Sequence, residues 1–326
     1  MIRHHRLARD PAAGTATPAT VSVIIPTFNG AQYIAETMAS VLDQTRDDLE
    51  LIVVDDGSTD RTREIVAGYG PPVRLVTQPN AGVSTARNRG IREARGAFIC
   101  LLDQDDYWFP DKLERQLQAM AAHPQCGVVY SSFFPWQPDA AGIFPTPGSY
   151  DPSRYPDDID PEYSGWIYHQ LLIDCWMLTS TAMFRQDVFE RCGSFDETLP
   201  YSEDWALWLV MSRTYPFVKL NRPSTLYRQH PRQGNRTLRR IDYRTRLLAA
   251  AVRQWGLCSR DGRCLDARTF ARQLAAYHAE FAFHHLRAGN RATAARSLVR
   301  AWVCHPSKMK YLAQCAAGLL GWRPNW

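Results

Sequence analysis

Two groups of aspartates in this 326-residue chain could hold a cation or accept hydrogen bonds from a polar ligand. Asp55 and Asp56 stand in VDDGSTD, and Asp103, Asp105 and Asp106 stand in LLDQDD. Carboxylates packed this closely raise one another's pKa unless a cation or a donor-rich ligand offsets their charge. Mg²⁺ and Mn²⁺ take oxygen ligands, and substrate phosphates commonly complete their shell. The D-x-D spacing of Asp103 and Asp105 therefore predicts a hard-metal site shared with a phosphorylated ligand.

Each aspartate cluster also has a structural interpretation, because a DG turn followed by a helix cap uses the same residue types. The clusters follow two apolar, β-branched segments, residues 51–54 and 98–102. Parallel α/β sheets bind ligands outside the carboxyl ends of their strands, where the loops form a crevice. Two acidic clusters at two such ends favour the ligand site over the turn alone.

The elements that must position these residues alternate between strand and helix. Strands are predicted at residues 21–26, 51–54, 73–76 and 98–102, and helices at 31–45, 61–68, 84–94 and from Pro110 onwards. This order predicts an α/β fold with a mostly parallel, doubly wound, Rossmann-like sheet. Residues 131–160, rich in Pro, Gly and Asp, predict a long loop or lid.

The end of the chain differs from the rest in charge and periodicity. Residues 1–226 hold 19 Lys and Arg against 29 Asp and Glu, whereas residues 227–326 hold 19 against 4. Helical periodicity from about residue 241, broken at Gly256, at residues 288–290 and at Pro306, predicts several short helices. Such a basic helical region can bind an anionic membrane surface or be a solvated face without a partner. Nucleic acid is not expected, because no RNA- or DNA-binding module accompanies the charge.

The sequence predicts neither a membrane span nor a disulfide framework. No apolar stretch reaches the roughly 18 residues of a spanning helix. Residues 1–20 lack an apolar signal region and predict a flexible arm. The eight cysteines are scattered, which favours reduced thiols in a cytoplasmic protein, with Cys258 and Cys264 as the one conceivable pair.

Six stretches, in this order, resemble the motifs of glycosyltransferase family 2: VSVIIPTFNG, VDDGSTD, QPNAGVSTARNRGIREARG, LLDQDDYWFPDKLERQ, GSFDETLPYSEDWALWL and LYRQH. The resemblance implies the GT-A fold, a nucleotide-sugar donor with UDP-sugar as the default, and inversion of the sugar's anomeric centre. It covers a domain of residues 21–233, followed by a basic helical region of residues 234–326. A glycan or a lipid-linked molecule is the acceptor that it implies, with the enzyme in the cytoplasm or on the inner face of the membrane.

The resemblance also implies donor-binding roles for residues of the first three motifs. These residues are Pro26, Phe28, Asn29, Asp56, Asn80, Arg87 and Asn88. Asp56 matches the residue that accepts a hydrogen bond from the nucleotide base. Arg87 could instead lie on a solvated helix face, as could Arg89.

The later motifs match the residues that surround the diphosphate. Asp103 matches a ribose or metal partner, and Asp105 matches the direct ligand of Mg²⁺ or Mn²⁺. Arg228 and His230 match a basic motif that closes over the diphosphate, and His230 is a further candidate metal ligand. A loop cap is the structural alternative for His230.

The pair Glu203 and Asp204 supplies the candidate catalytic base. A carboxylate that takes the acceptor's proton during attack contributes typically about 10² to 10⁴ in rate. Adjacent residues on a helix point about 100° apart, so only one of the pair should face the acceptor. The family pattern favours Asp204, and Glu203 remains the rival.

Two other functions fit parts of the pattern. A sugar-phosphate nucleotidyltransferase also binds sugar phosphates and metal, but its first strand should lead into a Gly-rich, basic loop, whereas this strand leads into PTFNGAQYI. A non-catalytic nucleotide-sugar-binding protein would not need Asp103, Asp105 and Asp204 together.

Overall fold

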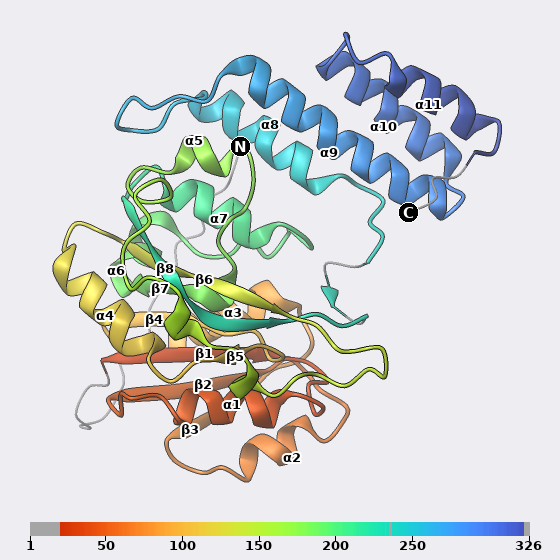
Figure 1. Cartoon of the computed structure of the whole chain (residues 1–326). Coiled ribbons are helices and arrows are strands. Elements are labelled where there is room, and N and C mark those ends of the chain that lie inside the picture. The colour runs from red at the N-terminus through yellow and green to blue at the C-terminus, as the bar shows by residue number, and fades with distance from the viewer. Residues whose placement is uncertain (1–19, 232, 235–236, 323–326) are drawn as a thin grey trace. The chain divides into compact units, whose positions relative to one another are not determined.

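The computed structural model describes residues 20–231, 233–234 and 237–322, so the predicted arm lies, apart from residue 20, outside the described residues. The chain divides into two compact units, a sheet unit and a helical unit (Figure 1). The sheet unit comprises residues 20–167 and 175–231. The helical unit comprises residues 168–174 and the described residues from 233 to 322.

The sheet unit confirms the predicted α/β class. Its strands are β1 (Val21–Thr27), β2 (Leu49–Asp55), β3 (Val73–Thr77), β4 (Phe98–Leu101), β5 (Tyr107–Trp108), β6 (Val128–Trp136), β7 (Ala182–Arg185) and β8 (Phe217–Arg228). They form one sheet in the order β3-β2-β1-β4-β7-β6-β8-β5. The first four strands are parallel, as predicted, and β6 is parallel to β8. The sheet is mixed beyond β4, because the three remaining pairs are antiparallel.

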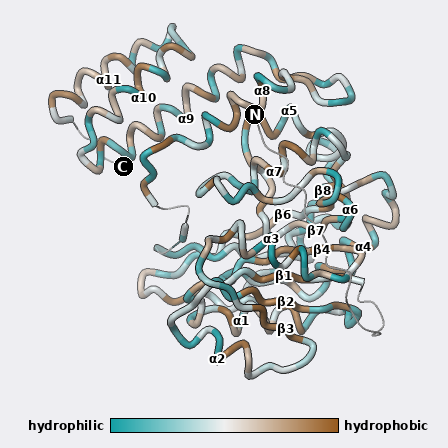
Figure 2. Tube along the Cα trace, turned by 180° about the vertical axis from the view of Figure 1, so that it is seen from behind, coloured by the Kyte–Doolittle hydropathy of each residue, from teal (hydrophilic) through white to brown (hydrophobic). Residues whose placement is uncertain are grey.

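Six helices belong to the sheet unit. They are α1 (Ile34–Leu42), α2 (Thr62–Ala67), α3 (Val83–Glu93), α4 (Lys112–Ala122), α6 (Gln186–Cys192) and α7 (Glu203–Met211), with a 3₁₀ turn η3 (Thr179–Thr181) before β7. Every residue of β1 is buried, which its apolar and β-branched sequence predicts. Figure 2 shows the hydrophobic colouring along β1 and β2, with hydrophilic colour in the loops around them.

The parallel strands end at the same edge of the sheet. Thr27 pairs with Asp55 in the register of β1 and β2, and Ile24 pairs with Leu101 in that of β1 and β4. The turns that begin after Thr27, Asp55 and Leu101 therefore emerge side by side. Asp56 and the three aspartates of LLDQDD lie in these turns, and Asp55 is the last residue of β2.

Helix α3 packs on β1 through a glycine. A Cβ atom at Gly90 would lie 2.3 Å from Ile24 Cγ2, and the Ile24 side chain is fully buried. Side chains in a close-packed core cannot move aside freely. Only glycine therefore allows α3 to lie this close to β1.

Gly90→Ala is expected to lower the free energy of unfolding. Overpacking typically costs about 1–3 kcal/mol, which outweighs the gain in helix propensity of up to about 1 kcal/mol. Urea unfolding followed by circular dichroism measures the change. Gly148→Ala is the matched control, because no atom lies within 4 Å of a Cβ there. Equal midpoints for the two variants would contradict the close approach of α3 and β1.

The predicted loop over residues 131–160 is wrong in its first part. Strand β6 continues to Trp136, which pairs with Arg228 of β8. The aromatic residues of this segment suit a strand, and its partner is distant in sequence, so local composition alone misses it. Two short 3₁₀ helices follow, η1 (Pro147–Ser149) and η2 (Pro152–Arg154).

The helical unit contains α5 (Tyr168–Leu171), α8 (Tyr243–Trp255), α9 (Ala267–Arg287), α10 (Arg291–Cys304) and α11 (Lys310–Leu319). The predicted breaks at Gly256, residues 288–290 and Pro306 fall between these helices. Asp242 and Asp266 accept hydrogen bonds from the third backbone N–H beyond them and so cap α8 and α9. Among the described residues, no helix combines the length and the apolar character needed to cross a membrane.

The expectation that all thiols are reduced is wrong, since Cys258 and Cys264 form a disulfide. The chain between them makes a hairpin, in which Ser259 N donates to Arg263 O and Leu265 N donates to Leu257 O. This pairing brings the two Cα atoms to 3.9 Å. A local turn, and not the spacing of cysteines over the whole chain, therefore makes the pair.

Candidate active site

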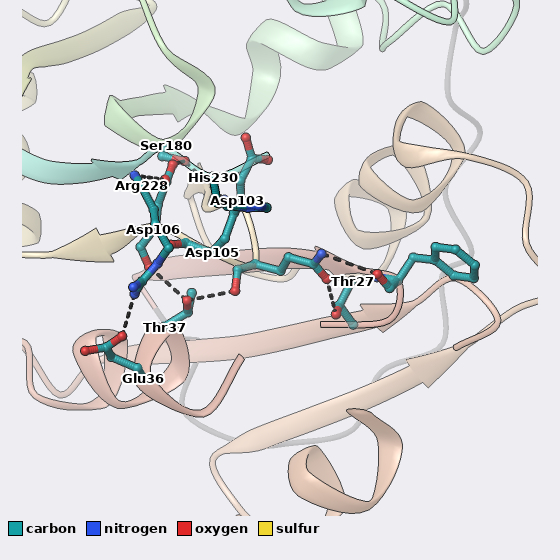
Figure 3. Close-up of polar contacts among 11 residues, drawn as sticks. Thr27, Glu36, Thr37, Asp103, Asp105, Asp106, Ser180, Arg228 and His230 are labelled. Atoms are coloured by element: carbon teal, nitrogen blue, oxygen red, sulfur yellow. Dashed lines mark hydrogen bonds and ion pairs between the residues drawn. The ribbon is translucent and has the colours of Figure 1, made fainter. Parts of the chain in front are cut away.

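The turn that carries Asp103, Asp105 and Asp106 is fastened to β1 by the side chain between them. Gln104 Oε1 accepts hydrogen bonds from Thr27 Oγ1 at 2.6 Å and from the Phe28 backbone N–H at 2.9 Å. The hydroxyl of Thr37 on α1 lies 2.9 Å from the carbonyl oxygens of Gln104 and Asp106 (Figure 3). The acidic turn is thus held against both β1 and α1.

Asp105 lies against His230, which follows β8. Asp105 Oδ2 is 2.7 Å from His230 Nε2. Both side chains are mostly buried, with 17% and 13% of their surface exposed. The structure therefore brings together two of the three predicted metal ligands, 125 residues apart in sequence.

The third of these aspartates, Asp106, is buried and anchors the end of β8. Ser180 Oγ donates to Asp106 Oδ2 at 2.5 Å, and the backbone N–H of Arg228 donates to Asp106 Oδ1 at 3.0 Å. Burial raises the pKa of Asp106 well above its ordinary value, and the charges of Asp105 and Asp103 raise it further. Asp106 thus joins β8 to the acidic turn from inside the protein.

Arg228 lies among three aromatic rings and contacts the acidic turn. Its guanidinium carbon is 3.7 Å from the ring centre of Trp136, 4.5 Å from that of Tyr33 and 4.8 Å from that of Phe144. Arg228 Nε donates to the carbonyl of Asp105 at 2.6 Å.

The same guanidinium also forms an ion pair with Glu36 of α1 (Figure 3). Only 2% of Arg228 is exposed. Its contacts hold the backbone of the acidic turn in place. The resemblance implied a different role, in which Arg228 closes over a diphosphate.

Arg87 joins the acidic turn to α7. Its guanidinium donates to Asp103 Oδ1 at 2.7 Å and to Glu203 Oε1 at 2.9 Å, and it lies 5.1 Å from the ring centre of Phe195. Burial alone would lower the pKa of Arg87, but the charges of Asp103 and Glu203 outweigh it and raise the pKa above its ordinary value. The solvated alternative for Arg87 is therefore wrong. Arg89 is exposed and pairs with Glu93 on its own helix.

Glu203 and Asp204 lie in the first turn of α7, and the two carboxyl groups have different surroundings. Glu203 is engaged with Arg87. Burial raises the pKa of Asp204 to about 7, and the charge of Glu203 adds to the shift while that of Arg87 opposes it. A carboxyl group with a pKa near neutrality can both take up and release a proton at physiological pH.

The turn after β1 carries the first three predicted donor residues. Pro26 is buried within β1, whereas 44% of Phe28 is exposed. Asn29 has a positive φ of 51°. Its backbone N–H donates to Ser58 Oγ and its side-chain oxygen accepts from the Thr59 N–H, which ties this turn to the one after β2.

Asp56 is held by the segment that precedes α3. Its carboxylate accepts hydrogen bonds from Gln78 Nε2 and from the backbone N–H groups of Ala81 and Gly82 at 2.8–2.9 Å. A carboxylate offers about four acceptor sites, so these three bonds leave room for one more donor. Asn80, in the same segment, is exposed.

The Asn88 side chain contacts the loop between α6 and α7 and does not contact the acidic turn in the hydrogen bonds described for it. Its side-chain amide bonds to the backbone N–H and C=O of Phe195 and to Glu197 Oε1. The predicted donor residue thus fixes the segment that leads to α7.

Sequence reasoning missed Glu36, Thr37, Gln104 and Ser180. Gln104 lies inside the recognised LLDQDD stretch, and its position between two aspartates was the available signal. Glu36 and Ser180 lie 192 and 74 residues from the partners that they contact, so no local pattern marks them.

The donor atoms at Asp105 and His230 suit a divalent cation. Mn²⁺ accepts carboxylate oxygen and imidazole nitrogen, and Mg²⁺ is commonly held by one or two carboxylates together with substrate phosphates. Within the described ranges, no group of three or more His, Cys, Asp and Glu side chains is arranged to hold a metal ion by itself. The pair fits a cation that shares its shell with a phosphorylated ligand, and the Asp103 carboxylate beside it is engaged by Arg87.

Comparison with known proteins gives a family match and a series of relatives. The family model described as Glycosyl transferase family 2 matches residues 22–192, which is more than half of the chain. An uncharacterized glycosyltransferase of Rickettsia typhi is 31% identical over 196 residues, covering 59% of this chain and 58% of that protein. Chondroitin synthase of Pasteurella multocida is 30% identical over 205 residues, covering 62% of this chain and 20% of the synthase. The chain thus matches little more than half of the first relative's length.

Solved structures resemble the fold over almost the whole chain. S. aureus TarS 1-349 in complex with UDP-GlcNAc is 17% identical, with a TM-score of 0.60, covering 92% of this chain and 90% of that one. The mannosyltransferase PcManGT from Pyrobaculum calidifontis, in complex with GDP-Man and Mn²⁺, is 22% identical, with a TM-score of 0.55 and coverage of 98% and 83%. At these identities the likeness concerns the fold alone.

Proposed function

Because the chain belongs to glycosyltransferase family 2, we propose that it transfers a sugar from a nucleotide-sugar donor to a hydroxyl group of a glycan or lipid-linked acceptor. Its fold is the GT-A fold that the sequence resemblance implied. We take a UDP-sugar as the default donor and inversion as the stereochemical course. The chondroitin synthase relative supports a role in polysaccharide synthesis, and we propose that the product belongs to the cell envelope.

The observation that carries this proposal is the contact of Arg87 with both Asp103 and Glu203. It joins the acidic turn, where a donor's phosphates and metal would lie, to the helix turn that carries Asp204. A donor-binding element and a candidate base thus meet in one cluster of charges. Transfer to an acceptor needs both, and they must lie close to each other.

In the proposed reaction, Asp204 takes the proton from the acceptor hydroxyl while that oxygen forms a bond to the anomeric carbon. The bond between this carbon and the diphosphate oxygen breaks, and its electron pair leaves with the nucleoside diphosphate. Attack on the face opposite the diphosphate inverts the anomeric centre. Glu203 stays paired with Arg87 and keeps it oriented.

Negative charge builds up on the departing diphosphate, and the site supplies positive charge to offset it. A Mg²⁺ or Mn²⁺ ion, when bound by Asp105, His230 and Asp103, would neutralise part of this charge. Arg228 fixes the carbonyl of Asp105 and thereby the position of that carboxylate. With a lipid-linked acceptor, the reaction would take place in the cytoplasm at the inner face of the cell membrane.

The products distinguish this proposal from its rivals. The purified chain is screened with UDP-, GDP- and dTDP-sugars and Mn²⁺ by thermal unfolding. A ligand at about 100 times its Kd adds about 2.7 kcal/mol to the free energy of unfolding. The donor that shifts unfolding is then incubated with acceptors, and we expect release of the nucleoside diphosphate.

Two outcomes would contradict sugar transfer. Release of pyrophosphate from a nucleoside triphosphate and a sugar phosphate would identify a nucleotidyltransferase. Tight donor binding without turnover on any glycan or lipid-linked acceptor would identify a non-catalytic binding protein.

A further inference from the structure

The last two helices of the helical unit expose an unusual number of large apolar side chains. We call this set the apolar face, and its exposed fractions are Val299 42%, Val303 62%, Met309 60%, Leu319 52%, Leu320 89% and Trp322 42%. Burying these side chains would be favourable, since transfer of apolar surface out of water lowers the free energy. Such a patch typically marks an interaction site.

The packing of α11 fixes which of its sides is exposed. Tyr311 and Gly318, seven residues apart, are buried on the inner side. A Cβ at Gly318 would lie 2.7 Å from Leu286 Cδ2 of α9, so α11 lies tightly on that helix. The outer side then carries Leu319 and Leu320, and it has no covering element among the described residues.

The charged side chains of α10 and α11 all have one sign. No Asp or Glu follows Glu280 in the sequence, whereas residues 281–326 contain seven Lys and Arg. Arg296 and Arg300 are exposed on the same side of α10 as Val299 and Val303, because these positions are three or four residues apart. Basic and apolar side chains therefore alternate on this side of α10.

We propose that the apolar face binds the surface of a lipid bilayer that contains anionic lipids. A helix that combines exposed apolar side chains with Lys and Arg and lacks acidic residues lies in the membrane interface, where the apolar groups enter the acyl boundary and the cations meet headgroups. A second copy of the chain is a poorer occupant, because pairing this face with itself would oppose cations to cations. The inference does not depend on sugar transfer.

Vesicle sedimentation with the full chain tests this proposal. We expect binding to vesicles of phosphatidylcholine and phosphatidylglycerol in equal amounts to be at least about tenfold tighter than to phosphatidylcholine alone. Leu319→Glu/Leu320→Glu is expected to weaken binding by about tenfold or more, because it places charges in the apolar part of the interface. Ile143→Glu is the matched control, since this residue of the sheet unit is 66% exposed; it should bind like the unaltered chain.

A second pair of variants tests the charges independently. Arg296→Glu/Arg300→Glu should weaken binding and reduce its dependence on salt, since about 1 kcal/mol per cation, or about fivefold, is lost near an anionic surface. Arg253→Glu, at an exposed position of α8, should have a smaller effect. Circular dichroism of each variant verifies the fold.

Three results would overturn the proposal. Both double variants could bind the mixed vesicles as tightly as the unaltered chain. The chain could bind phosphatidylcholine equally well at all salt concentrations. Light scattering could show a dimer that Leu319→Glu/Leu320→Glu converts to a monomer, which would assign the face to a second copy.

Discussion

Replacing Asp204 with Asn is expected to lower kcat for sugar transfer by about 10²- to 10⁴-fold, the usual contribution of a general base. The amide has the same shape and cannot accept the acceptor's proton. Donor binding, measured by thermal unfolding with the nucleotide-sugar and Mn²⁺, should stay within about twofold. This separation of turnover from binding is what a base, as opposed to a donor ligand, predicts.

Glu203→Gln is the matched variant one position away. It removes the charge of one of the two partners of Arg87 and leaves Asp204 in place, so we expect a smaller loss of kcat. If Asp204→Asn retained full turnover while Glu203→Gln was inactive, the two roles would have to be exchanged.

The pH dependence of kcat/KM tests the role of Asp204 independently, through its protonation state. Asp204 must be ionised to act as a base, and its pKa is raised to about 7. The rate should therefore rise with pH below about 7 and level off above it. Glu203→Gln should move this midpoint to lower pH, because the charge of Glu203 raises the pKa of Asp204. A midpoint unchanged in this variant would contradict the coupling of the two carboxyl groups.

Asp105→Ala is expected to abolish the Mn²⁺-dependent part of the thermal stabilisation by the nucleotide-sugar. Asp105 and His230 offer a carboxylate and an imidazole 2.7 Å apart, and the loss of one donor removes half of that pair. Stabilisation by a saturating ligand amounts to about 2.7 kcal/mol at 100 times its Kd, so its loss is measurable by differential scanning fluorimetry.

Two controls accompany this variant. Asp151→Ala changes an exposed aspartate that caps the short 3₁₀ helix η2 and should keep the Mn²⁺ effect. Asp204→Asn should also keep it. A full Mn²⁺ effect in Asp105→Ala would show that the cation is held elsewhere.

Much of the fold could be predicted from local sequence patterns. The buried, β-branched strands β1 and β2 and the alternation with α1 to α3 predicted the parallel half of the sheet. Because parallel strands end at one edge, the same patterns predicted that Asp56 and Asp103 lie at one edge of the sheet, but not that β1 lies between the strands that precede them. The roles of these residues in catalysis and donor binding remain predictions.

The rest depends on contacts between distant parts of the chain. Strand β6 pairs with β7 and β8, which lie far along the sequence. The local composition of residues 131–136 therefore indicates a loop, although these residues belong to a strand. The Glu36 contact of Arg228 arises only when α1 and β8 come together. The burial of Arg87 likewise requires Asp103 and Glu203 from two other segments.

The shared guanidinium of Arg87 also limits how this protein could be redesigned. Replacing Arg87 would leave Asp103 and Glu203 without the cation that both contact, and removing one partner of a buried ion pair commonly costs about 3–5 kcal/mol. A library that varies position 87 without also varying the segment around Glu203 would mostly sample unstable proteins. New acceptor preferences should be sought by varying both positions in the same round of selection.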